Sequence, residues 1–218
     1  MRHERASDLP KLGAREYVQG GTIFNGLLAV CDEIYGADWL RGARIPSFKL
    51  ERESTANGRF VIDEAPIRDL TVNATFHARS REREIHAVYV DEGREFRREP
   101  YDEERFNQPL SVGTDLSGEF VLPAPRPRAD FMKGVVGANK LVHQKADRFG
   151  GELKKIQFLY LKDLSGDCLL ACDEELRLTI CNLTVKETER EIWTINRVTV
   201  AGTRHSSELR LCYRAQRP

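Results

Sequence analysis

Two asparagines lie inside apolar segments of helical length, and among the residues of this sequence they are best placed to take part in chemistry. Asn25 lies within residues 17–30, YVQGGTIFNGLLAV, and Asn139 lies within residues 131–142, FMKGVVGANKLV. An amide is costly in an apolar helix unless it is hydrogen-bonded. Each asparagine therefore either ties its helix to the backbone of a surrounding sheet or holds a carbonyl, a carboxylate or a water molecule.

Three further candidates lie close to these asparagines in the sequence. The hydroxyl of Tyr17 has no counterpart in the second segment, where Phe131 takes its place. This asymmetry suits a single working site, or the two rings are interchangeable core residues. Asp130 is placed to cap the second helix, or to reach a site at the N-terminus of that helix. His143 lies toward the helix C-terminus, where a solvated or capping histidine is expected.

The cysteines do not fit a metal site. Cys168, Cys172 and Cys181 have the spacing of no standard zinc motif and lie among apolar residues, which indicates buried thiols. The total of five cysteines is odd, and the sequence has no secretory signal and no long apolar run, so we predict a reducing cytoplasm. We expect neither a metal nor another cofactor.

The charge balance excludes two classes of partner. Lys and Arg together number 34, as do Asp and Glu, so the formal net charge is zero. Nucleic acids and anionic membranes both favour a basic excess, and we expect neither as a partner. The length of 218 residues allows one large domain or two domains of about 100 residues each.

The chain repeats one order of elements. Eight residues of the two helical segments match in order: Tyr17, Gly20, Asn25 and Leu27 with Phe131, Gly134, Asn139 and Leu141. Three later landmarks also match: Phe48 with Phe158, Asn73 with Asn182, and residues 82–85 with 189–192, both EREI. The offsets fall steadily through 114, 110, 109 and 107. This pattern indicates a duplication, each copy being a buried helix followed by long antiparallel strands.

The composition divides the chain into four parts. Residues 1–16 are polar and aperiodic, and form a flexible N-terminal arm or a first short strand. The first repeat covers 17–91 and the second covers 129–218. Residues 92–128 are charged, rich in turns and end in a proline-rich run, so we interpret them as a linker.

Alternating apolar residues predict strands after each helix. In the first repeat, residues 47–53 turn at residues 56–58 (ANG) into a second strand, and a long hairpin follows. His77 and His86 lie on the two strands of that hairpin, and we expect a cross-strand surface pair. In the second repeat, one strand is followed by a meander of three strands over residues 175–215.

A glycine-led buried helix followed by an antiparallel meander, over residues 17–90 and 131–214, resembles the hot-dog fold. The strands IQFLYLKDL, ELRLTICNLTVKE, REIWTINRVTVAG and SSELRLCYRA are similar to the sheet of β-hydroxyacyl-carrier-protein dehydratases and related thioesterases. Two copies imply an α+β double hot-dog: two antiparallel sheets, each wrapped around a buried helix, as a pseudo-dimer in one chain. Such a chain closes alone as a monomer or pairs again as a homodimer.

The resemblance implies an acyl thioester of coenzyme A or an acyl carrier protein as substrate, in fatty-acid-like or polyketide metabolism. The thioester carbonyl would meet the N-terminus of a buried helix, where free N–H groups and the helix dipole stabilise charge on oxygen. Gly20 or Gly21 would occupy that place in the first repeat, and Gly134 with Val135 in the second. His143 would also contact the substrate.

The sequence departs from the dehydratases at the residues that carry out dehydration. Counted from Gly20 and Gly134, the dehydratase histidine falls on Lys11 and Pro125, and the acid falls on the two asparagines. An amide does not titrate and cannot be the general acid or base of that reaction.

The resemblance then favours thioester hydrolysis, or decarboxylation of a malonyl-type group whose enolate is held by helix N–H groups and asparagine. Tyr17 or Asp130 would deliver a proton. Dehydration or isomerisation by an acid or base located elsewhere ranks below these reactions. The alternatives are a non-catalytic hot-dog protein that binds a ligand or acts as a scaffold, and an unrelated α+β domain.

Overall fold

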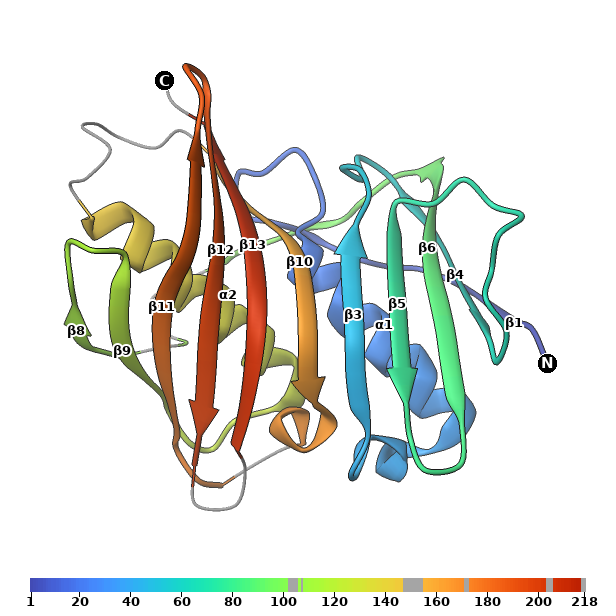
Figure 1. Cartoon of the computed structure of the whole chain (residues 1–218). Helices are drawn as coiled ribbons and strands as arrows, with labels where there is room; N and C mark the ends of the chain where they lie inside the picture. Colours follow the sequence, from blue (N-terminus) through green and yellow to red (C-terminus); the bar gives the residue numbers. More distant parts are fainter. Residues whose placement is uncertain (102–105, 107, 147–154, 171–172, 203–205, 217–218) are drawn as a thin grey trace. The chain divides into compact units, whose positions relative to one another are not determined.

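The computed structural model describes residues 1–101, 106, 108–146, 155–170, 173–202 and 206–216. The chain divides into two compact units, Met1–Asp102 and Glu103–Pro218. In each unit one long helix lies against one face of an antiparallel sheet (Figure 1). Among the described residues, no helix has the length and apolar character needed to cross a membrane.

The first unit is built around α1 (Gly20–Tyr35). Its sheet has the strand order β1 (His3–Ala6), β4 (Asn57–Asp63), β6 (Glu84–Arg94), β5 (Ala74–Arg79) and β3 (Arg44–Leu50). The turn η1 (Ala37–Leu40) follows the helix, and the short strands β2 (Lys11–Leu12) and β7 (Arg98–Glu99) form a separate parallel pair.

Apolar residues at intervals of three and four give α1 one face to bury. Phe24 lies on this face, with its ring centroid 5.3 Å from that of Phe48 on β3 and 5.9 Å from that of Phe76 on β5. Gly36 ends the helix at φ 81°, a backbone conformation that favours glycine, and its N–H donates to the carbonyl of Asp32. The first unit therefore has an aromatic core between helix and sheet.

The second unit is built around α2 (Arg128–Lys145). Its sheet has the strand order β8 (Gln108–Val112), β9 (Ser117–Leu122), β11 (Leu176–Glu187), β12 (Glu191–Ala201), β13 (Ser206–Gln216) and β10 (Lys155–Ser165). The turn η4 (Gly166–Leu169) follows β10. The predicted meander is confirmed, because β12 pairs with both β11 and β13.

Part of the linker that the sequence predicts over 92–128 is sheet instead. Strands β8 and β9 lie within it, and β9 pairs with β11 from Leu122 opposite Leu176 to Ser117 opposite Cys181. A tight turn, in which the N–H of Gly113 donates to the carbonyl of Ser117, joins the two strands. β8 is exposed along most of its length, so its residues do not alternate between buried and exposed positions as a half-buried strand does.

The N-terminal arm contains a strand, the second of the two alternatives that the sequence allows. β1 pairs with β4, with His3 opposite Ile62. The side chain of Asn57 holds the following residues, since its Oδ1 accepts from the N–H of Leu9 and the hydroxyl of Ser7. Most of residues 1–16 therefore belong to the first unit rather than to a flexible segment.

The expected turn at residues 56–58 does not join neighbouring strands. β3 pairs with β5, whereas β4 pairs with β1 and β6. Asn57 serves as the anchor for the N-terminal segment, and Gly58 brings β4 so close to β6 that an added Cβ would lie 1.7 Å from the carbonyl oxygen of Val90. Asparagine and glycine are thus needed here for packing rather than for a hairpin turn.

Candidate functional site

The inward face of α2 carries polar side chains at two buried positions. Asn139 has no exposed surface, and neither its Oδ1 nor its Nδ2 has a hydrogen-bond partner among the described residues. His143 is one helical turn further on and only 2% exposed. Residues four apart lie on the same helix face, so both side chains enter the interior between α2 and its sheet.

Two residues of β12 face this part of the helix. The hydroxyl Oγ1 of Thr194 lies 3.1 Å from Nε2 of His143, and Nδ2 of Asn196 donates to the same hydroxyl at 2.9 Å. Both strand residues are buried, and they alternate with outward-facing neighbours. The imidazole is thereby held on the sheet by a chain of two hydrogen bonds.

Tyr213 completes the group from the neighbouring strand β13, where it lies directly opposite Thr194. Its ring centroid is 5.7 Å from that of His143 and 6.0 Å from that of Phe158. Its hydroxyl is buried and has no hydrogen-bond partner in the described part of the chain. We call Asn139, His143, Thr194, Asn196 and Tyr213 the buried polar cluster.

The cluster is electrically neutral. Burial lowers the pKa of His143 from 6.5 to about 4, so the imidazole is uncharged near neutral pH. Burial raises the pKa of Tyr213 above its ordinary value, and the phenol therefore keeps its proton. The remaining members are amides and a hydroxyl, which do not titrate in this range.

The cluster also has unused hydrogen-bonding capacity. Besides the Asn139 amide and the Tyr213 hydroxyl, Nδ1 of His143 and Oδ1 of Asn196 are buried and lack partners among the described residues. Leaving one such group unsatisfied costs about 1–3 kcal/mol, and native proteins keep few of them. The mixture of donors and acceptors fits a neutral polar group or a water molecule better than it fits a charge.

The start of α2 differs from the predicted arrangement in two respects. Pro127 is the N-cap residue, and Asp130 lies in the first turn without capping the helix. Gly134 lies six residues after Arg128, inside the helix, where an added Cβ would be 2.5 Å from Leu122 Cδ2. Glycine at this position therefore allows α2 to pack on β9, and it does not offer an N–H group to a substrate.

A small cleft lies beside the first turn of α2. Its volume is about 200 Å³, and its lining residues are Phe106, Pro123, Pro125, Arg126 and Asp130. Arg126 is 4% exposed, and its guanidinium lies over the ring of Phe131 at 5.7 Å. Lys133 Nζ is 3.5 Å from the carboxylate of Asp130.

This cleft and the buried polar cluster are separate places on one helix. Asn139 is eleven residues after Arg128, and a rise of about 1.5 Å per residue puts it about 16 Å along the axis. The N–H groups of the first turn and the Asn139 amide therefore cannot act on the same carbonyl oxygen. Val135 lies between them, fully buried, as part of the core.

The first unit keeps its predicted residues together at the start of α1. The helix begins at Gly20, and no atom lies within 4 Å of the place that a Cβ of Gly21 would take. Tyr17 precedes the helix by three residues and is half-buried. Asn25 follows within the second turn and is also half-buried. The N-cap residue Gln19 makes no side-chain capping bond, and its carbonyl accepts from the N–H groups of Thr22 and Ile23.

The two asparagines are not equivalent in their surroundings. The buried faces of the helices match at an offset of 111 rather than 114: Gly20, Ile23, Phe24, Leu27, Leu28 and Cys31 with Phe131, Gly134, Val135, Ala138, Asn139 and Val142. In this register Asn139 takes the place of Leu28, and Asn25 takes the place of the half-buried Val136. The expectation of a solvated His143 is wrong, because the histidine lies on the buried face of α2 and is 2% exposed.

Sequence reasoning missed Thr194, Asn196 and Tyr213. The strand sequence EIWTINRVTVA alternates, and its inward positions are Ile192, Thr194, Asn196, Val198 and Val200. Two polar residues in an otherwise apolar inward row are the signal that could have identified them. Of the thiols expected to be buried, Cys168 is buried and Cys181 is exposed, and Cys172 lies outside the described residues.

No family model and no curated protein matches the chain. A conserved hot-dog-fold protein of unknown function from Alicyclobacillus acidocaldarius is 9% identical, with a TM-score of 0.54, over 100% of this chain and 94% of the other. A tesB protein from Mycobacterium avium subspecies paratuberculosis is 10% identical, with a TM-score of 0.52, over 100% and 93%. A protein assigned as an oleoyl thioesterase from Lactobacillus plantarum is 7% identical, with a TM-score of 0.51, over 100% and 98%.

These similarities are similarities of fold. They extend over the full length of this chain and nearly the full length of each solved structure. With one helix and one antiparallel sheet in each unit, the predicted double hot-dog fold is confirmed.

Proposed function

We propose that this double hot-dog chain binds an acyl thioester, of coenzyme A or an acyl carrier protein, and hydrolyses it in the second unit. The observation that carries the proposal is the buried polar cluster, where four residues keep unpartnered donors or acceptors in a neutral interior. Names of fold neighbours agree with a thioester, since two of them are a tesB protein and a protein assigned as an oleoyl thioesterase.

The chemistry of the cluster favours hydrolysis over decarboxylation. Hydrolysis needs donors for the carbonyl oxygen and an acceptor for the attacking water. Nδ2 of Asn139 and the hydroxyl of Tyr213 are donors, whereas Oδ1 of Asn139 and of Asn196 are acceptors. A malonyl carboxylate would meet those two acceptors and would bring a charge into a site that already suppresses the charge of His143.

Nδ1 of His143 can either donate a hydrogen bond to the carbonyl oxygen or accept one from the attacking water. The Thr194 hydroxyl accepts a hydrogen bond from Asn196 and has one hydrogen of its own. If that hydrogen goes to Nε2 of His143, then Nδ1 carries a proton and donates to the carbonyl oxygen. If Nε2 carries the proton instead, then Nδ1 accepts a hydrogen bond from the water.

The second candidate is a non-catalytic protein that binds the thioester. It is favoured by two observations: the cluster has no carboxylate, and its histidine, with a pKa of about 4, is a weak base. Such a protein would use the same polar atoms to hold the ligand and would leave it unchanged.

Intact mass spectrometry of thioesters on coenzyme A and on a carrier protein distinguishes these functions. The panel contains malonyl, methylmalonyl, 3-hydroxyacyl and long-chain acyl species, each incubated with the protein and with an Asn139→Ala variant. Hydrolysis predicts loss of the acyl group from at least one species, and no loss with the variant. Loss of carbon dioxide would indicate decarboxylation, and a bound but unchanged thioester would indicate the non-catalytic protein.

A further inference from the structure

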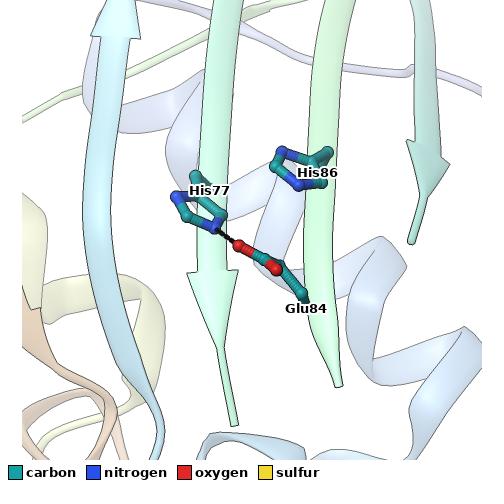
Figure 2. Close-up of side chains that lie close together, drawn as sticks. All are labelled: His77, Glu84 and His86. Carbon is teal, nitrogen blue, oxygen red and sulfur yellow. Dashed lines mark hydrogen bonds and ion pairs between the residues drawn. The ribbon is translucent and has the colours of Figure 1, made fainter. Parts of the chain in front are cut away.

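Three side chains with metal-binding groups lie together on the first unit. His77 on β5 and His86 on β6 are directly opposite each other in the antiparallel pair, and Glu84 lies two residues before His86. Residues two apart on a strand point to the same side. Figure 2 shows the three side chains on one face of the two strands, with Glu84 directed at His77. The alternate residues Phe76 and Ala87 are buried, and the ring of Phe76 packs on Phe24 of α1, so the face with the three side chains is the outer one.

The three groups are within reach of one ion. His77 Nε2 is 2.8 Å from Glu84 Oε1, and the two imidazole centroids are 4.7 Å apart with the rings nearly parallel. One ligand atom from each residue lies within 4.8 Å of the other two. Ligands at about 2.0–2.2 Å from a tetrahedral ion are about 3.4 Å apart, so side-chain rotations suffice to bring them together.

Two charged residues lie beside the three candidate ligands. Arg79 on β5 is opposite Glu84 and contacts its carboxylate at 2.9 Å. Asp63 on β4 is opposite His86 and adds a second negative charge to this face.

We propose that His77, Glu84 and His86 form a binding site for a divalent transition-metal ion, zinc by its ligand set. Two imidazole nitrogens with one carboxylate oxygen suit zinc and its neighbours, whereas calcium and magnesium require oxygen ligands. Three protein ligands leave one tetrahedral position for water. The site lies on the first unit and shares no residue with the buried polar cluster, so it stands independently of thioester hydrolysis.

Zinc titration of the full-length protein, after removal of metals with EDTA, tests this site. We compare His77→Gln and His86→Gln with a His3→Gln control, which removes an imidazole from β1 instead. Loss of one ligand should weaken zinc binding at least about tenfold, judged from the 10–100-fold effect of removing even an outer-shell partner. The control should bind zinc as the wild type does, and circular dichroism in EDTA should be the same for all four proteins.

Arg79→Gln sharpens the test because the expected change has the opposite sign. Removing the guanidinium frees the carboxylate of Glu84 for the ion, so zinc should bind more tightly. An unchanged or weaker affinity in this variant would contradict Glu84 as the third ligand.

Imidazole resonances of the wild-type protein provide a readout that does not depend on variants. Zinc should shift the signals of His77 and His86 and leave those of His3 and the buried His143 in place. The proposal is overturned if zinc does not saturate a site, or if it shifts the signals of neither His77 nor His86. It is also overturned if a His77→Gln/His86→Gln double variant retains the wild-type affinity for zinc.

Discussion

Corresponding rows of paired strand residues carry different side chains in the two units. In the first unit a row across β3, β5 and β6 consists of Phe48, Phe76 and Ala87. In the second unit the corresponding row across β10, β13 and β12 consists of Phe158, Tyr213 and Thr194. On their buried faces, α1 carries Phe24 and Leu28, whereas α2 carries Val135 and Asn139 at the matching positions. At these positions the first unit is wholly apolar, and the second unit carries a phenol, a hydroxyl and an amide.

One buried tyrosine in each unit shows a related contrast. Tyr89 of the first unit is fully buried, and its hydroxyl donates to the carbonyl of Ala56 at 3.0 Å. Tyr213 of the second unit is equally buried, and its hydroxyl has no such partner in the described part of the chain. A duplicated fold can keep one copy as a stable scaffold while the other gives up stability for a site.

Leu28→Asn would give the first unit the amide of the second. We expect a loss of about 4 kcal/mol in the free energy of unfolding, because the change removes buried apolar volume and adds an unsatisfied amide. Urea unfolding measures it. A loss below about 1 kcal/mol would mean that the first interior accepts polar groups as readily as the second.

The pH dependence of stability should come in part from His143. Its pKa is 6.5 in the unfolded reference and about 4 when folded, so the unfolded chain binds the proton first as the pH falls. The stability is therefore complete above about pH 6.5 and declines toward pH 4, by up to about 3 kcal/mol. Urea unfolding at several pH values should show a shallower decline for His143→Leu, and an identical decline would contradict a buried neutral imidazole.

Asn139→Leu would give α2 a leucine at the position that matches Leu28 of α1. Because an unsatisfied amide is removed, the protein should gain about 1–3 kcal/mol, reduced by any crowding from the larger side chain. Thermal unfolding measures the gain, and the same variant should lose thioester hydrolysis. A clear destabilisation without a crowding defect in its crystal structure would mean that the amide is satisfied in solution.

Tyr213→Phe would give the row of the second unit the phenylalanine that the first unit has at Phe76, and it removes only one oxygen atom. The phenol oxygen is buried without a partner among the described residues, so we expect a gain of about 1 kcal/mol or less in stability. Calorimetry of the variant beside the wild type is the measurement. A loss of more than about 1 kcal/mol would point to a hydrogen bond made by this hydroxyl, for example to ordered water.

Much of the fold could be predicted because apolar periodicity reports burial directly. The two helices and the β11–β12–β13 meander follow from it, and so does the β5–β6 hairpin with His77 opposite His86. The strand order of the first unit could not be predicted in this way. Asn73 precedes β5, whereas its sequence match Asn182 lies on β11, at a different place in the sheet. Pairing between strands distant in sequence leaves no local pattern.

The candidate site was predicted in part. Asn139 stands out because an amide is rare on an apolar helix face, but its match with Asn25 is displaced by three residues, nearly one helical turn. A shift of that size preserves the apolar rhythm while it rotates a residue from the buried face to the half-buried one. The alternation of β12 indicates that Thr194 and Asn196 face inward, but their contact with His143 follows only from the packing of β12 against α2.

The most direct test of the account compares Asn25→Ala with Asn139→Ala in hydrolysis of one acyl thioester that the wild type consumes. With the working site in the second unit, Asn139→Ala should lower kcat by about 100-fold or more, in line with the loss of one buried polar contact to a reacting carbonyl. Asn25→Ala should stay within a few-fold of wild type. A large loss in Asn25→Ala together with wild-type activity in Asn139→Ala would contradict the account and place the chemistry at the start of α1.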